Sequence, residues 1–128
     1  MRALLDTHTF LWWVTDDERL SRRARRVIAQ GSNEIFFSAA SAWEMSIKST
    51  LGRIELPQDL ERYIPDQLER NAFQALPVRI EHALRVAALP ELHRDPFDRL
   101  LVAQAVVEGL AILSKDRRLA GYPARVIW

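Results

Sequence analysis

Short apolar segments alternate with helical patterns along this chain of 128 residues. The segments that read as strands are RALL (2–5), EIFFS (34–38), LAIL (110–113) and the C-terminal ARVIW, with FQALPV as a weaker candidate. Strands that alternate with helices are joined by crossover connections, which is typical of an α/β domain with a mainly parallel sheet. The length suits one such domain, over residues 1–128.

Capping residues and glycines predict where the N-terminal helices begin and end. HTFLWWV begins a short helix for which Thr7 is a candidate cap, and Ser21 caps a basic helix that Gly31 ends in the left-handed conformation. The stretch SAWEMSIKSTLG predicts a helix that begins at Ser41 and is closed by Gly52.

Three further helices are expected in the second half of the chain. PQDLERYIPDQLERN has a helical pattern that is broken or kinked at Pro65. RIEHALRVAALP predicts a helix that ends before Pro90. The apolar helix from Pro96 to Gly109 has proline at its favoured first position.

Composition excludes several classes of protein. The chain has no cysteine, so it can have neither a disulfide framework nor a thiolate metal site. Its longest apolar run, LLVAQAVV, is far below the roughly 20 residues of a membrane span. Asp6 and His8 interrupt the apolar N-terminus, and no small-residue cleavage site follows. We therefore expect a cytoplasmic protein without membrane association.

Acidic residues fall where predicted strands end and the next helices begin. Asp6 directly follows the first strand, and Asp116 comes three residues after LAIL. Glu44 and Asp98 lie in the first turns of predicted helices. In a parallel sheet the carboxyl ends of the strands share one edge, where ligands bind. The four carboxylates are therefore expected to meet in one cleft.

Each acidic residue also has a purely local explanation. Ser41 and Glu44 have the spacing of a capping box, and Asp6 could cap the helix that follows it. Asp95 and Asp98 could both bind free N–H groups at the start of their helix, and Asp116 could be a turn residue. Taken singly, these local roles are at least as good an explanation as a shared site.

A divalent cation would explain why four carboxylates share one cleft, since like charges repel as water is excluded. Oxygen ligands favour Mg²⁺ or Mn²⁺ over zinc or copper. Such an ion would activate water for phosphodiester hydrolysis, with Asp6 and Asp98 as principal ligands and Glu44 and Asp116 holding waters or a second ion. Asp98 is the better candidate for the metal, and Asp95 for the helix cap.

Basic residues cluster in two stretches, although the formal net charge is only +1. Arginine clusters attract phosphate backbones, but they are equally often a solvated helix face. The candidates for contact with nucleic acid are Arg22, Arg23, Arg26, Arg117 and Arg118.

Four stretches together resemble the PIN-domain ribonucleases, and within them the VapC-type toxins of type II toxin–antitoxin systems. They are LLDTHTFLWW, FFSAASAWEMSIK, DPFDRLLVAQA and ILSKDRRL, and their order spans nearly the whole chain. The region between residues 51 and 92 matches nothing distinctive. The resemblance implies a PIN-like three-layer α/β/α domain around a central, mainly parallel sheet.

The resemblance also implies an activity, site residues and partners. It implies a Mg²⁺- or Mn²⁺-dependent endoribonuclease that acts as a toxin and inhibits translation or growth. By position, Asp6, Glu44, Asp98 and Asp116 correspond to the acidic residues of the family, which hold the metal and are catalytic. Ser114 matches a hydroxyl position of the last motif, and with Asp95 and Thr7 it is expected to support the site. Expected partners are RNA, a cognate antitoxin whose tail enters the acidic groove, and a second copy of the chain.

Three other functions stay open at this point. A metal-free nuclease would need two histidines across a phosphate, and the chain has only His8, His82 and His93. A phosphatase of the haloacid-dehalogenase type would need an aspartate two residues after Asp6, where His8 stands. A catalytically inactive PIN-like binding module would use Trp12 or Trp13 at an interface, unless both are partly buried.

Overall fold

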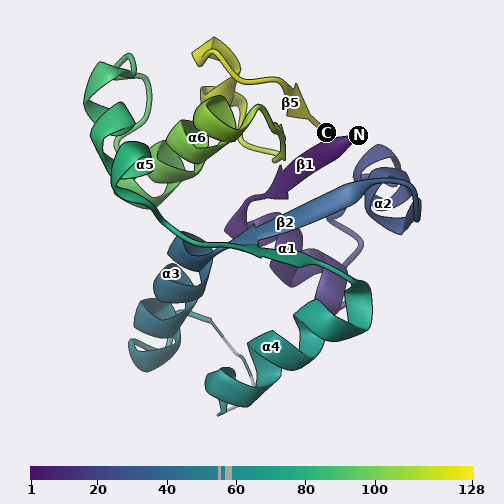
Figure 1. Cartoon of the computed structure of the whole chain (residues 1–128). Helices are drawn as coiled ribbons and strands as arrows, with labels where there is room; N and C mark the ends of the chain where they lie inside the picture. Colours follow the sequence, from purple (N-terminus) through teal and green to yellow (C-terminus); the bar gives the residue numbers. More distant parts are fainter. Residues whose placement is uncertain (55, 57–58) are drawn as a thin grey trace.

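A five-stranded parallel sheet forms the centre of the protein in a computed structural model that describes residues 1–54, 56 and 59–128 (Figure 1). The strand order is β3-β2-β1-β4-β5, so the sheet is parallel throughout. The strands are β1 (Arg2–Leu5), β2 (Glu34–Ser38), β3 (Gln74–Leu76), β4 (Ala111–Leu113) and β5 (Val126–Ile127). The predicted α/β class and parallel sheet are confirmed, with the C-terminal strand at an edge.

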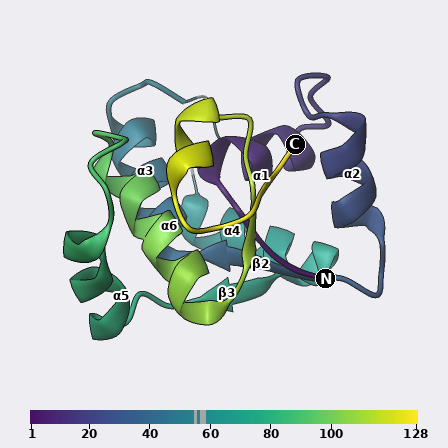
Figure 2. The ribbon, with the colours of Figure 1, turned by 90° about the horizontal axis from the view of Figure 1, so that it is seen from above.

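Helices connect the strands in the predicted alternation. The α-helices are α1 (Thr7–Val14), α2 (Arg22–Ala29), α3 (Ala39–Thr50), α4 (Leu60–Asn71), α5 (Ile80–Arg85) and α6 (Pro96–Glu108). Two 3₁₀ turns follow, η1 (Val86–Ala88) after α5 and η2 (Arg117–Gly121) after β4. Figure 2 shows α5 and α6 on one side of the sheet and α1, α2 and α4 on the other.

Alternate residues of the central strands pack into two separate hydrophobic cores. Ala3 and Leu5 face a core that includes Phe10 of α1 and Phe37 of β2. Leu4, between them, faces a second core built largely from α6, η1 and η2. The side-chain period of two in a strand produces this division, because successive residues point to opposite faces. The three-layer α/β/α arrangement is therefore confirmed.

The strand order places a topological switch point at β1. The chain leaves β1 toward β2 on one side, and it reaches β4 on the other side only later. The backbone N–H of Asp6 donates to the Leu113 carbonyl at 3.2 Å, so the carboxyl ends of β1 and β4 are joined directly. In open α/β sheets this crevice is the usual ligand site.

Several predicted helix boundaries are wrong. Helix α3 begins at Ala39 and is capped by Ser38, whose hydroxyl accepts from the Ala40 N–H at 3.0 Å, so Ser41 lies inside the helix. Helix α2 ends before Gln30, and Gly31 does not adopt the left-handed conformation. Helix α4 runs through Pro65 and does not break there. The predicted start of that helix, at 57 and 58, lies outside the described residues.

None of the helices in the described ranges combines the length and the apolar composition that crossing a membrane requires.

Candidate functional site

One cavity of about 320 Å³ contains all four predicted acidic residues. It opens at the carboxyl edge of the sheet, where β1, β2 and β4 end. Its lining is mostly charged and comprises Asp6, His8, Trp12, Glu44, Lys48, Asp95, Asp98, Lys115, Asp116 and Arg118. Residues from four distant parts of the sequence are thus brought together as the strand-end argument predicted.

Asp6 joins the end of β1 to the start of α1. It is the N-cap of α1, with its Oδ1 accepting from the Thr9 N–H at 2.8 Å, so the predicted Thr7 cap is wrong by one residue. The side chain is buried, and burial raises the pKa of Asp6 against the opposing hydrogen bonds from Ser114 and Thr9. Among the described residues Asp6 has no ion-pair partner. It is a buried carboxylate without a counter-charge.

Glu44 is held on both of its oxygens. The Thr7 hydroxyl donates to Oε1 at 2.6 Å and lies 3.0 Å from the Ser41 hydroxyl, and the Lys48 ammonium contacts Oε2. The predicted capping box of Ser41 and Glu44 is therefore wrong, since Glu44 points into the site from the second turn of α3. Lys48 was missed by sequence reasoning, although a glutamate four residues before a lysine indicates such a pair.

Asp95 and Asp98 divide the two roles expected of the start of α6. Asp95 caps the helix, with Oδ1 accepting from the N–H groups of Phe97 at 2.8 Å and Asp98 at 3.3 Å. The side chains of both residues line the cavity, but only Asp95 caps the helix. Burial, and then the negative charge of Asp95, raise the pKa of Asp98 to about 7, with further contributions from Asp6 and Glu44.

Asp116 and Ser114 come from the loop after β4. Asp116 caps η2, and the Arg118 guanidinium donates to both of its oxygens. Burial raises the pKa of Asp116, but the hydrogen bonds from Arg118 and His93 outweigh it and bring the pKa down to about 2. The buried Ser114 hydroxyl accepts from the Asp116 N–H at 3.0 Å. Asp116 therefore stays ionised, with its charge partly neutralised.

His93 lies behind two of the carboxylates. Its Nε2 is 2.8 Å from Asp116 Oδ2 and 3.2 Å from Asp98 Oδ2, and its side chain is 2% exposed. Nδ1 accepts from the Asp95 N–H at 3.0 Å, so the ring hydrogen is on Nε2. Both ring nitrogens are engaged, and His93 is a hydrogen-bond donor to the acidic cluster. Its three-atom grouping with Asp98 and Asp116 is compact enough for a metal ion, but the donor geometry favours an orienting role.

The donor set fits a hard divalent cation. Asp6 and Asp98 offer carboxylate oxygens on one cavity wall, and burial disfavours the charge of each. A bound cation would reverse that effect, because it favours the ionised forms. Oxygen ligands without any thiolate suit Mg²⁺ or Mn²⁺. The carboxylates of this cavity therefore fit such an ion.

The predicted basic residues fall in two places. Arg118 lines the acidic cavity, and Arg117 is exposed beside it on η2. Arg22, Arg23 and Arg26 are exposed on α2 and do not line that cavity. The structure thus brings Arg118 alone among these five into the candidate site.

The remaining histidines and the tryptophans do not form a second catalytic pair. His82 is a buried residue of α5. Its Nδ1 accepts from the Arg79 N–H, and its Nε2 faces Glu108 at 3.0 Å. His8 is the one histidine that lines the acidic cavity, so the geometry does not support metal-free histidine chemistry. Trp12 and Trp13 are both partly buried, and the exposed tryptophan is Trp43.

Comparisons with known proteins show the family. The family model described as PIN domain matches residues 3–124. Ribonuclease VapC22 of Mycobacterium tuberculosis is 30% identical over 121 residues, which is 94% of this chain and 91% of that protein.

Solved structures share the fold. A chain in the crystal structure of VapBC2 from Rickettsia felis, bound to a DNA fragment from their promoter, superposes with a TM-score of 0.74 at 13% identity, covering 100% of this chain and 99% of that one. A chain of the DNA-bound VapBC from Salmonella typhimurium gives 0.70 at 15% identity, covering 99% and 97%. At these identities the likeness concerns the fold alone.

Proposed function

This chain belongs to the PIN-domain family, in its VapC-type branch, and from that premise we propose that it is a metal-dependent endoribonuclease acting as the toxin of a toxin–antitoxin pair. As such it would inhibit translation or growth by cutting RNA. Its 30% sequence identity to Ribonuclease VapC22, over most of both chains, supports ribonuclease activity.

The observation that carries the proposal is the convergence of Asp6, Glu44, Asp98 and Asp116 on one cavity. Asp6 is 5% exposed and Glu44 3% exposed, so at least two of these carboxylates are removed from water. Such a cluster is costly for a fold unless a cation offsets the repulsion. A binding scaffold has no use for such an unfavourable cluster of carboxylates, whereas a metal-dependent nuclease needs the cluster to hold its ion.

We assign Asp6 and Asp98 as the principal metal ligands. A bound Mg²⁺ or Mn²⁺ supplies Lewis-acid chemistry, in that it lowers the pKa of coordinated water and neutralises charge on the phosphate. The hydrogen bond from the Thr9 N–H fixes the Asp6 carboxylate for this role. The first turn of α6 holds Asp98 at the wall of the cavity. Both carboxylates would be held ready before the substrate arrives.

Glu44 and Asp116 would orient water around the same centre. The Thr7 hydroxyl and Lys48 fix Glu44, and Arg118 and His93 fix Asp116. Either carboxylate could accept a proton from the attacking water at a free oxygen lone pair. Lys48, Lys115 and Arg118 supply positive charge at the rim, where the RNA phosphate must approach five acidic side chains.

The partners follow from the same family membership. We propose that the chain binds a cognate antitoxin, which supplies a segment to the acidic groove, and that two copies of the chain form a homodimer. The structural neighbours named above are the complexes VapBC2 and VapBC, which supports a protein partner.

Cleavage of RNA by the purified protein tests the proposal. A mixed RNA pool would be incubated with Mg²⁺, Mn²⁺ or EDTA, and Asp98→Asn and Asp6→Asn would be compared with the parent chain. We expect cleavage only with the ions and loss of cleavage in both variants, because each removes a ligand charge. Calorimetric titration with Mn²⁺ should show weaker binding to both variants.

Other outcomes point to other functions. Cleavage that persists in EDTA, or at the parent rate in Asp98→Asn, would mean that the site is wrongly assigned. Metal binding without cleavage of any RNA would favour the catalytically inactive binding module. Cleavage of a small phosphate ester but not RNA would favour the phosphatase.

A further inference from the structure

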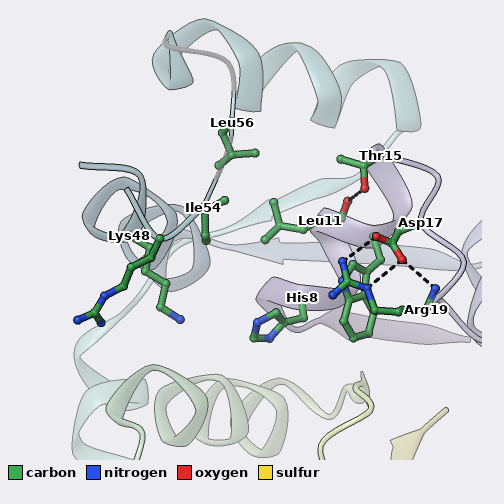
Figure 3. Close-up of a pocket in the computed structure, with 10 residues that line it drawn as sticks. His8, Leu11, Thr15, Asp17, Arg19, Lys48, Ile54 and Leu56 are labelled. Atoms are coloured by element: carbon green, nitrogen blue, oxygen red, sulfur yellow. Dashed lines mark hydrogen bonds and ion pairs between the residues drawn. The ribbon is translucent and has the colours of Figure 1, made fainter. Parts of the chain in front are cut away.

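A second and larger cavity, of about 530 Å³, adjoins the acidic one (Figure 3). We propose that this cavity binds one nucleotide of the RNA substrate, next to the bond that is cut. The inference rests on the proposed nuclease function and adds to it a substrate subsite. The volume lies within the roughly 300–1,000 Å³ range of pockets that hold small ligands.

The two cavities are neighbours, because three side chains line both. His8, Trp12 and Lys48 belong to the walls of each cavity. In Figure 3, Lys48 and Ile54 lie on the left, His8 and Leu11 lie to their right on α1, and Leu56 lies above them. A strand whose phosphate sits at the acidic residues therefore passes directly into the second cavity.

The described lining residues of the two cavities differ in charge. The acidic cavity has five carboxylates against three basic side chains, whereas the described lining of the second has Arg19, Arg53 and the shared Lys48 against the carboxylate of Asp17. Arg19 is engaged with Asp17 at 2.8 Å and Lys48 with Glu44. Within the described part of the chain Arg53 has no ion pair, and its side chain is exposed. Arg53 is the side chain of this cavity that we assign to a phosphate of the strand.

The apolar wall of the cavity suits a base. Leu11, Ile54 and Leu56 are all partly exposed, and the ring of His8, one turn before Leu11 on α1, has its centroid 5.8 Å from that of Trp12. A flat base between an aromatic ring and aliphatic side chains buries apolar surface without a requirement for a particular sequence. Aromatic and basic groups side by side are the usual composition of single-strand binding sites.

An RNA strand fits the pair of cavities better than a protein segment does. A segment that neutralises five carboxylates must be basic, and its continuation would then meet the positive side chains of the second cavity. RNA is negative throughout, and in the acidic cavity the metal ion offsets its phosphate charge. For a strand that runs through both cavities, the nucleic acid therefore agrees better with the charges of the described lining residues than a basic protein segment does.

The experiment measures RNA binding without cleavage. In the Asp98→Asn background with Mg²⁺, Arg53→Ala is compared with Arg85→Ala, an exposed arginine on α5 at the opposite face of the sheet, on labelled oligoadenylate and oligouridylate. We expect Arg53→Ala alone to weaken binding and to flatten the slope of log K against log salt by about 0.7, the loss of one phosphate contact to a single strand.

The base contact is tested by a cycle between protein and RNA. An abasic site moved along the oligonucleotide should weaken binding at one position, beside the site that the active protein cuts, by roughly 5- to 150-fold. Ile54→Ser, which removes part of the apolar wall, should reduce that penalty, because the contact is then already lost.

Each alternative outcome is distinguishable. Equal affinity and salt slope for Arg53→Ala and Arg85→Ala, or an abasic penalty unaffected by Ile54→Ser, would overturn the subsite, and metal-dependent cleavage by the parent protein would still support the nuclease. Unchanged RNA affinity with weakened capture of a partner protein would assign the cavity to that protein. If no form of the chain binds or cuts RNA, the subsite and the proposed function fail together.

Discussion

His93 is the residue whose position most affects how the acidic site would work. Its buried ring donates from Nε2 toward Asp116 and Asp98 and accepts the Asp95 N–H at Nδ1, so one side chain orients two carboxylates and the loop before α6. Residues that orient metal-binding side chains typically change metal affinity or activity by about 10- to 100-fold when they are replaced.

Two amide substitutions separate the roles of the two nitrogens of His93. His93→Gln can keep a donor near Nε2, and His93→Asn can keep an acceptor near Nδ1. We expect His93→Asn to lower kcat and Mn²⁺ affinity by about 10- to 100-fold, with KM little changed, and His93→Gln to retain more of both. The measurements are steady-state cleavage and calorimetry. If both variants lose the same activity and metal affinity, in proportion to their loss of thermal stability, His93 has only a packing role.

Asp98 should make the stability of the metal-free protein depend on pH. Its folded pKa, about 7, lies above its usual value, so the folded state holds a proton that the unfolded state has lost. Stability from this group is therefore full at acidic pH and is lost as pH rises from about 4 to about 7, by an amount on the order of a few kcal/mol.

Thermal unfolding in EDTA across this pH range tests that expectation. Asp98→Asn should lose less stability than the parent chain between about pH 4 and pH 7, because it has no proton to release there. Mg²⁺ should restore the parent protein near pH 7 and have little effect on the variant. A parallel decline in both proteins would mean that Asp98 does not titrate in this range.

At the level of residues, the acids could be predicted from the sequence, but most of the contacts that their neighbours make could not. Asp6 and Asp98 each stand where a strand or helix pattern changes, and that position implies the shared edge. Thr7 and His93 contact acids that are 37 and 23 residues away in sequence, at Glu44 and Asp116. Such contacts depend on the packing of whole elements, which local patterns do not specify.

Helix ends were predictable where one residue type decides them. Gly109 has φ of 67° at the end of α6, as glycine after an apolar helix indicates, but Gly31 lies beyond α2 without a positive φ. The start of α3 was placed too late because Ser38 and Ser41 are both acceptable caps by sequence. Tertiary packing chooses between them, since Ser38 also contacts Gln104 of α6.

The two glycines give a matched pair of substitutions. Gly109→Ala forces a side chain into the left-handed region and should destabilise the protein by about 1 kcal/mol. Gly31→Ala has an ordinary φ and nothing within 4 Å of the new methyl group, so it should be neutral or stabilise by up to about 1 kcal/mol through the unfolded state. Urea unfolding of both variants checks the difference. Similar losses would mean that Gly31 too needs its freedom.

The cap of α6 should contribute to the stability of the protein. Asp95→Ala leaves the N–H groups of Phe97 and Asp98 without an acceptor and should cost about 1 kcal/mol, whereas Asp95→Asn still caps the helix and should cost a few tenths. Urea unfolding in EDTA gives both values. If Asp95→Asn abolishes metal binding while the fold is kept, Asp95 belongs among the ligands.

For the whole molecule, the sequence predicted the class of the fold but not the order of its strands. Alternation implies a parallel sheet, and several strand orders satisfy it equally. The observed order brings β1 and β4 together, which places Asp6 beside Ser114 and Asp116. The site at the carboxyl edge of the sheet therefore forms only when β1 pairs with β4, a strand from near the other end of the sequence.

One apolar surface of the molecule is unexplained by the fold and bears on the proposed homodimer. Trp43 and Ile47 on α3 and Leu51 at its C-cap follow one another at intervals of four residues, and they are 61%, 37% and 61% exposed. A stripe of this spacing lies on one side of a helix, and contiguous exposed apolar side chains of this kind mark interaction surfaces. We therefore expect α3 to contribute to the interface between two copies.

Leu51→Glu tests that assignment, with Leu84→Glu as the control. Leu84 is 70% exposed on α5. Each substitution therefore places one negative charge at an exposed leucine, at the end of α3 for Leu51 and on α5 for Leu84. Sedimentation equilibrium should show a dimer for the parent chain and Leu84→Glu and a monomer for Leu51→Glu, because a glutamate buried at an interface loses its hydration without a partner. Dissociation by Leu84→Glu alone would move the interface to α5, and a monomeric parent chain would remove the homodimer from the proposed function.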